Sequence, residues 1–168
     1  MMEIVVGDIT QIGVDAIVNA ANEALAPGGG VCGAIFRAAG PQLVAACRAV
    51  APCPTGEARI TPGFEAKARW IVHAVGPVWR GGDRREAELL ASAYRASLEL
   101  AEDAGAVSIA FPAISTGIYG YPRDPAAHVA VTSVTAWAGE HAAPERVIFC
   151  CFSDGDAEIY RALLTNRS

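Results

Sequence analysis

The chain has 168 residues, of which 52% are hydrophobic and 18% are charged. This length fits one domain with one core, and the composition excludes disorder, collagen and coiled coil. A net charge of −5, without a run of Lys or Arg, argues against duplex nucleic acid, whose binding depends on neutralising phosphates. Because the chain is acidic and holds 17 glycines, we expect any bound phosphate to be met mainly by backbone N–H groups.

The N-terminal residues 1–8 have no positive region and no long apolar run, and no stretch approaches the roughly 18 apolar residues of a membrane span. We therefore expect a cytoplasmic protein that uses no membrane and, without an obvious exposed apolar face, a monomer. The five cysteines are odd in number and form no C-x-x-C motif, which predicts reduced, buried thiols. We expect neither a metal site nor a cofactor.

Short runs rich in Val and Ile alternate with helical patterns. The predicted strands are 3–6, 16–19, 58–61, 70–75, 107–111 and 146–152. Several are continuous apolar runs, as in strands that helices cover on both faces. The sequence therefore predicts a three-layer α/β domain over residues 1–168.

The predicted helices lie between these strands. Residues 31–39 and 42–50 form two, separated by Gly40-Pro41. A capping-box pattern at 83–86 predicts the start of a third, which ends at Gly105. Its expected inward residues are Leu90, Ala93, Tyr94, Leu98 and Ala101.

Two further helices complete the pattern. Asp124 and Pro125 read as the cap and first residue of one helix, and Ser153 or Asp154 as the cap of the last. The residues expected to face the core are Ala127, Val131, Val134 and Ala138 in the first, and Ile159, Leu163 and Leu164 in the second.

The first informative loop is Asn19-Ala20-Ala21-Asn22, followed by Gly28-Gly29-Gly30-Val31-Cys32-Gly33. Glycines between a strand and a helix start let N–H groups approach an anion. Residues 28–33 satisfy G-x-G-x-x-G, the dinucleotide fingerprint. That fingerprint should directly follow its strand and be followed by an acidic residue about 20 positions on, and neither condition holds. A merely flexible turn is the alternative.

The second informative loop is the segment 111–122, which leaves an apolar strand and enters a helix. Its Ser, Thr and two glycines offer hydroxyl and amide donors for phosphate oxygens. It lacks the Lys of a Walker loop, so nucleoside triphosphate hydrolysis is not indicated. In an open α/β sheet ligands bind beyond the carboxyl ends of the strands, so both loops could clasp one diphosphate.

Two smaller signals stand at other strand ends. Asp8 follows the first predicted strand, and Phe152 ends the last. A carboxylate can accept from an exocyclic amine and a Phe ring can stack on a base, so the two could hold an adenine. Taken singly, each is more often a helix cap or a core aromatic.

These motifs together resemble the macro domain family, nearly from end to end and most closely the MacroD-type branch. The matching segments are 7–10, 16–22, 28–35, 75–79 and 111–122. The resemblance implies a three-layer α/β/α fold with a mixed, mostly parallel sheet. It also implies binding of ADP-ribose or its esters, and hydrolysis of O-acetyl-ADP-ribose or of mono-ADP-ribose on acidic side chains of modified proteins.

The resemblance also implies residue roles. Asp8 and Ile9 would contact adenine, with Phe152 packed on it, and residues 115–119 would cradle the diphosphate. Asn22 would hold the distal ribose, and both Asn22 and the residue at position 32 would serve catalysis. The implied ligand contacts are Asp8, Ile9, Ala21, Asn22, Gly30, Val31, Cys32, Gly33, Pro112, Ser115, Thr116, Gly117, Ile118, Tyr119 and Phe152.

The chain departs from the family pattern at two positions. Cys32 stands where MacroD-type hydrolases usually carry an Asp that positions or activates water, and Phe36 where they usually carry His. A thiol accepts hydrogen bonds weakly, so general-base catalysis, typically worth about 10²–10⁴-fold, would be weakened or lost. A nucleophilic Cys32 is a further alternative, although no motif ties His73, His128 or His141 to this loop. The other alternative, which we favour over a nucleophile, is a small residue that merely fills the loop. Two functions stay open: an ADP-ribosyl ester hydrolase, and a module that binds ADP-ribose without turnover.

Overall fold

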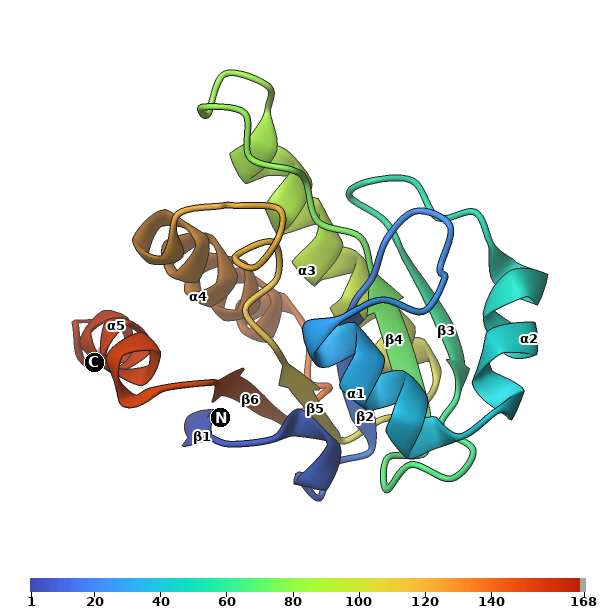
Figure 1. Cartoon of the computed structure of the whole chain (residues 1–168). Coiled ribbons are helices and arrows are strands. Elements are labelled where there is room, and N and C mark those ends of the chain that lie inside the picture. Colours follow the sequence, from blue (N-terminus) through green and yellow to red (C-terminus); the bar gives the residue numbers. More distant parts are fainter. Residues whose placement is uncertain (167–168) are drawn as a thin grey trace.

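A six-stranded sheet crosses the middle of the molecule in the order β1-β6-β5-β2-β4-β3 (Figure 1). The computed structural model describes residues 1–166, so the last two residues of the predicted domain lie outside the described part. The strands are β1 Met2–Val6, β2 Ala16–Ala20, β3 Ala58–Pro62, β4 Trp70–Ala74, β5 Ser108–Phe111 and β6 Arg146–Cys151. β3 is antiparallel to β4 and the other pairs are parallel, which confirms the mixed, mostly parallel sheet.

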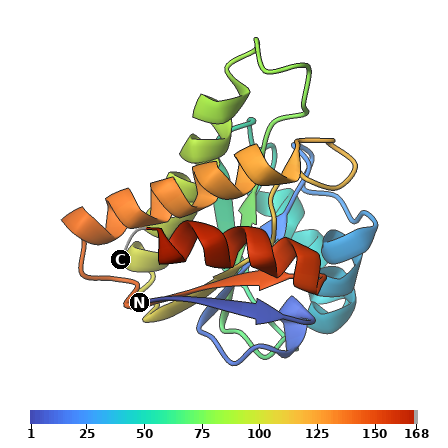
Figure 2. The same cartoon turned by 90° about the vertical axis from the view of Figure 1, so that its left-hand side faces the viewer.

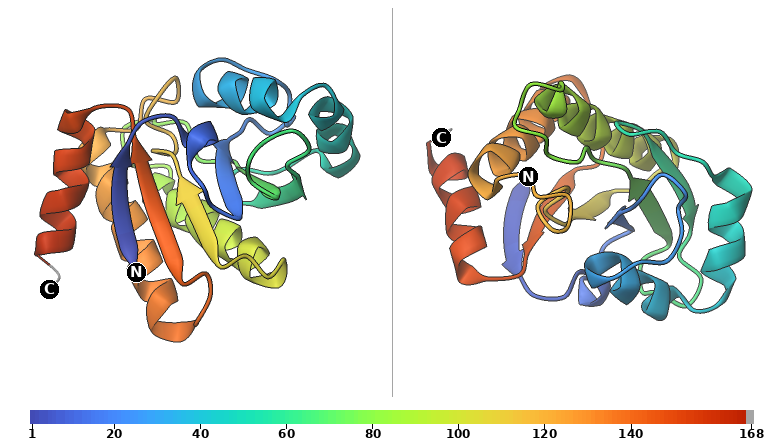
Figure 3. Two further views of the ribbon diagram at one scale, coloured as in Figure 1. Left: turned by 90° about the horizontal axis from the view of Figure 1, so that it is seen from below. Right: turned by 45° about the horizontal axis from the view of Figure 1, so that its top comes forward.

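Helices cover both faces of this sheet. They are α1 Gly30–Ala39, α2 Gln42–Val50, α3 Glu86–Asp103, α4 Arg123–Glu140 and α5 Asp154–Thr165, with a short 3₁₀ turn, η1, at Ile9–Gln11. α3, α4 and α5 lie on one face of the sheet, and α1 and α2 lie on the other (Figures 2 and 3). One buried apolar cluster joins the first three helices to the sheet, and a second joins α1 and α2 to it. The predicted three-layer α/β/α arrangement is confirmed.

Within residues 1–166, no single helix is long and apolar enough to cross a membrane. Only α1 and α2 taken together reach that length and apolarity, and they are bent by 116° at the break between them.

The predicted capping box at the start of α3 is wrong. Arg85, in the left-handed conformation, precedes the helix and provides no side-chain cap, and Asp83 lies farther out in the loop. Glu86 is buried, and its carboxylate accepts hydrogen bonds from the backbone N–H groups of Arg80 and Gly82, both at 2.9 Å, and of Arg84. Glu86 thus binds the preceding loop instead of closing a cap with Asp83.

Of the last two helices, α4 differs from the prediction in two details and α5 agrees with it. α4 begins at Arg123, so Asp124 lies in its first turn and is not the cap. Ala138 is exposed, and Trp137 is the buried residue of that turn. In α5, Ser153 is the cap as predicted, because its hydroxyl accepts from the N–H of Asp156. Ile159, Leu163 and Leu164 are half-buried against the core, as expected.

The direction of the strands positions the candidate site. Because β1, β2, β5 and β6 are parallel, their carboxyl ends meet at one edge of the sheet. The turns that leave these ends carry Asp8, Asn22, the loop after Phe111, and Phe152. Residues from four distant parts of the sequence are therefore brought to one place.

Candidate functional site

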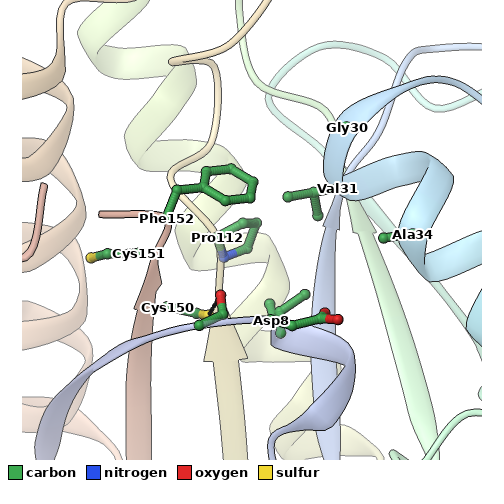
Figure 4. A pocket seen from close by; sticks show the side chains of 10 residues that line it. Asp8, Gly30, Val31, Ala34, Pro112, Cys150, Cys151 and Phe152 are labelled. Carbon is green, nitrogen blue, oxygen red and sulfur yellow. Dashed lines mark hydrogen bonds between the residues drawn. The ribbon is translucent and has the colours of Figure 1, made fainter. Parts of the chain in front are cut away.

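Two adjacent cavities lie at this edge of the sheet. The larger, about 520 Å³, is lined by Ala20, Ala21, Asn22, Gly28, Gly29, Gly30, Val31, Cys32, Gly76, Pro112, Ala113, Ile114, Ser115, Thr116, Gly117, Ile118, Tyr119, Arg123, Phe152 and Asp156. The smaller, about 340 Å³, is lined by Gly7, Asp8, Ile9, Gly30, Val31, Ala34, Pro112, Cys150, Cys151 and Phe152 (Figure 4). Four residues line both, so the two cavities are contiguous, and each has a size typical of ligand sites.

The structure brings together the predicted ligand contacts, with one exception. Every residue predicted to touch the ligand lines one of the two cavities, apart from Gly33. A Cβ on Gly33 would come within 2.7 Å of the Gly28 carbonyl oxygen, so Gly33 allows the glycine loop to pack against α1. It shapes the cavity from behind.

The glycine loop ends at the start of α1. Gly29 is the cap residue, and Gly30, the first helical residue, has a φ of +56°, which favours glycine. The first N–H groups of a helix have no carbonyl partner within the helix and carry a partial positive charge. Because Gly30, Val31 and Cys32 line the larger cavity, this helix end faces the space where an anion could lie.

The two predicted catalytic residues meet at the peptide of Ala26. The Asn22 amide donates to the Ala26 carbonyl and accepts from the Ala26 N–H, both at 3.0 Å. The Cys32 thiol donates to the same carbonyl at 3.8 Å. Both side chains line the larger cavity, and both are held by the loop that they flank.

A buried polar chain stands behind Cys32. The Asn19 amide nitrogen lies 3.7 Å from the Cys32 sulfur and 3.1 Å from His73 Nδ1, and the Thr61 hydroxyl lies 3.0 Å from His73 Nε2. Burial lowers the pKa of His73 to about 4, so the imidazole is neutral at pH 7. A histidine is thus linked to Cys32 through Asn19, a contact that no residue spacing in the chain indicates.

The second loop owes its shape to two close approaches. Ser115 has a φ of +69°, and a Cβ on Gly76 would come within 2.2 Å of the Ser115 hydroxyl oxygen. The backbone N–H of Trp79 donates to the Tyr119 carbonyl at 2.8 Å, and the ring centroids of Trp79 and Tyr121 lie 4.7 Å apart. The turn after β4 therefore supports the loop over the cavity.

Asp8 presents an ionised carboxylate to the smaller cavity. The side chain and then the backbone N–H of Thr10 donate to it, at 2.7 and 2.9 Å, and together they hold the pKa of Asp8 below its usual value. The carboxylate can therefore accept a hydrogen bond from an amine. Phe152, which is 74% exposed, points over Pro112 toward Val31 on the far side of the same cavity (Figure 4).

Two residues of the larger cavity lie outside every segment that the sequence analysis singled out. Arg123 and Asp156 line it and form an ion pair, with 2.8 Å between Nη1 and Oδ1. Arg123 directly follows the second loop, which was the only available signal, whereas Asp156 is 33 positions away.

The five cysteines are buried, as predicted, and free: Cys32, Cys47, Cys53, Cys150 and Cys151. Burial, with Cys32 nearby, raises the pKa of Cys47 to about 11, and burial likewise raises that of Cys150 to about 11. Between residues 1 and 166, His, Cys, Asp and Glu side chains form no group of three or more that could hold a metal ion.

Known proteins resemble the chain in sequence and in structure. The macro domain model matches residues 18–130. The chain belongs to the macro domain family. An O-acetyl-ADP-ribose deacetylase of Salmonella gallinarum is 54% identical to this macro domain, over 99% of this chain and 95% of the relative.

Solved macrodomains share the fold. The Oceanobacillus iheyensis macrodomain with ADP superposes with a TM-score of 0.94 at 44% identity, over 99% of this chain and 90% of the other. The Trypanosoma brucei macrodomain in complex with ADP-ribose gives a TM-score of 0.90 at 39% identity, over 97% of this chain and 68% of the other.

Proposed function

We propose that this macro domain binds ADP-ribose and hydrolyses esters that link ADP-ribose to an acyl group. The observation that carries the proposal is the continuity of the two cavities, which run from Asp8 past two amide-rich loops to Asn22 and Cys32. Relatives named O-acetyl-ADP-ribose deacetylase and structures solved with ADP and ADP-ribose support it.

The proposed ligand would lie along these two cavities. Its adenine would occupy the smaller cavity, with its amine donating to Asp8 and its ring against Phe152. Its diphosphate would lie between the start of α1 and residues 115–119, and its distal ribose would reach Asn22. Backbone amides are fixed and uncharged, so they can bind the phosphates at little cost in side-chain ordering.

The proposed reaction is attack by water on the acyl carbon of the ester. The water oxygen forms a bond to that carbon, the bond to the ribose oxygen breaks, and a proton passes from the water to the ribose oxygen. The products are the free acid and ADP-ribose. The Asn22 amide retains one N–H and one oxygen lone pair beyond its bonds to Ala26, and these would orient the ribose.

A second function, binding without turnover, is favoured by the state of Cys32. The thiol donates its proton to the Ala26 carbonyl, where a carboxylate would only accept. Among the described residues, Asp156 is the only one with a carboxylate that lines the larger cavity, and it belongs to α5 and not to the loop of Cys32. If the chain does turn over an ester, the attacking water would have to be oriented by the bound diphosphate and the loop amides instead of by a carboxylate.

The test compares the wild type, Cys32→Asp and Asn22→Ala on O-acetyl-ADP-ribose and on an auto-modified mono-ADP-ribosyltransferase. We expect slow release by the wild type, faster release by Cys32→Asp by about 10²-fold if a general base is restored, and a loss for Asn22→Ala. Product is measured by mass spectrometry, and ADP-ribose affinity by calorimetry on the same samples.

The outcomes separate the two functions. Tight binding without release by the wild type would favour the binding module. An active wild type that Cys32→Asp does not accelerate would contradict the handicap assigned to the thiol. Absence of ADP-ribose binding by the wild type would remove both functions.

A further inference from the structure

The larger cavity is lined by a positively charged side chain to which the proposed phosphate binding by backbone amides assigns no role. Of the described residues that line the two cavities, Arg123 alone carries a cationic side chain. It is the first residue of α4 and directly follows the loop that ends at Pro122. Its position places a guanidinium beside the amides of the proposed phosphate cradle.

The Arg123 guanidinium is only partly occupied. Nη1 donates to Asp156 Oδ1 at 2.8 Å, and the remaining N–H groups make no hydrogen bond to the described part of the chain. The Arg123 side chain is 66% exposed, whereas that of Asp156 is 19% exposed. Since guanidinium carries five N–H donors in a planar fork, four remain available to a second, anionic partner.

Asp156 is placed to oppose an anion in the same cavity. Its carboxylate lines the cavity and neutralises much of the field that Arg123 would otherwise project into it. Because Arg123, Asp156 and residues 115–119 line the same cavity, both charges would act on a phosphate bound there, and salt would weaken both effects.

We infer that Arg123 binds the diphosphate of the nucleotide ligand, and that Asp156 competes with the phosphates for this guanidinium and so limits affinity. This inference rests on the proposed function, because it presumes a diphosphate in the cradle. It makes Arg123 and Asp156 binding residues with opposite effects on the same ligand.

Four single variants test the inference. Arg123→Gln and Asp156→Asn each remove one charge of the pair. Arg161→Gln and Glu158→Gln are the matched controls, because they remove the same charges from a neighbouring ion pair on α5 that does not line either cavity. Affinities for ADP-ribose, ADP and uncharged adenosine are measured by calorimetry or by competition, at about 0.01 M and about 1 M salt, where the Debye length is about 30 Å and about 3 Å.

We expect Arg123→Gln to weaken ADP-ribose and ADP about three- to tenfold at low salt, and Asp156→Asn to tighten them about two- to threefold. Both effects should shrink at high salt, adenosine should be unaffected, and both controls should match the wild type.

Two results would overturn the inference while leaving the proposed function intact. One is an Arg123→Gln variant that binds ADP-ribose as Arg161→Gln does. The other is an Asp156→Asn variant that binds adenosine and ADP more weakly, because the carboxylate would then contact a ribose hydroxyl. If the wild type itself binds no ADP-ribose, the proposed function fails as well.

Discussion

Cys32 is held between the proposed ligand and a buried polar chain. Its sulfur accepts from Asn19 and its proton points to the Ala26 carbonyl, so the side chain is fixed on both sides. An Asp at this position could accept from Asn19 in the same way and would present a second oxygen to water. The proposed handicap of the hydrolase therefore rests on one difference, a sulfur in place of two carboxylate oxygens, and the Cys32→Asp variant tests it.

His73 makes stability depend on pH. Its pKa falls from a usual value near 6.5 to about 4 on folding, because it is buried. The unfolded chain therefore takes up a proton below about pH 6.5, while the folded chain stays neutral until about pH 4. The stabilisation from neutral His73 is complete above pH 6.5 and is lost as the pH falls through this window.

We expect the free energy of unfolding to drop by up to about 3 kcal/mol between pH 6.5 and 4 from this group, at about 1.4 kcal/mol per tenfold change in proton affinity. Denaturant unfolding of the wild type and of His73→Gln across this range measures the drop. His128→Gln, at an exposed position, is the control and should keep the wild-type slope. Equal slopes in all three proteins would contradict the assignment.

Among the helices and loops, Glu86 connects the start of α3 to the loop that supports the larger cavity. It binds the loop that contains Arg80 and Gly82, and the neighbouring Trp79 holds the Tyr119 carbonyl over the larger cavity. Burial by itself would raise the pKa of Glu86, but the donated backbone hydrogen bonds outweigh it and the pKa lies below its usual value. The carboxylate thus stabilises the fold above its unfolded pKa, and this contribution is lost as the pH falls through the lower, folded value.

Glu86→Gln should therefore unfold at lower denaturant than the wild type near neutral pH, with a difference that diminishes in acid. An amide presents only one acceptor oxygen, so Gln cannot replace all three hydrogen bonds that the carboxylate accepts from the loop. Glu88→Gln, which alters an exposed pair with Arg85 in the same turn, should behave as the wild type does. A Glu86→Gln variant with unchanged stability at neutral pH would show that the loop does not depend on this carboxylate.

Elements were predictable because their signals are local. Each strand was predicted to within one residue at either end, since burial on both faces produces apolar runs. The glycine loops were also predictable, because their glycines are adjacent or nearly adjacent in the sequence. Contacts that join distant positions were not: Asn19 and His73 are 54 positions apart, and Arg123 and Asp156 are 33 apart. Glu86 was misread because a capping box and a buried, loop-binding carboxylate share the same local pattern.

For the whole molecule, the net charge of −5 and the proposed anionic ligand are compatible because, of the described residues, only one basic and one acidic side chain line the larger cavity. Its surfaces are built from loop amides, a helix start and apolar side chains, with Arg123 and Asp156 at nearly balanced charge. An acidic protein of this kind can bind a small diphosphate while it repels the extended phosphate backbone of nucleic acid.

Calorimetry on Gly117→Glu tests most directly whether residues 115–119 cradle the diphosphate of ADP-ribose. A Cβ at Gly117 meets no atom within 4 Å, so the variant should fold and place a carboxylate in the cradle. Gly13→Glu is the matched control, since Gly13 is equally unobstructed and lines neither cavity. We predict micromolar ADP-ribose binding by the wild type and Gly13→Glu, and no measurable binding by Gly117→Glu. Retained affinity in Gly117→Glu would contradict the account.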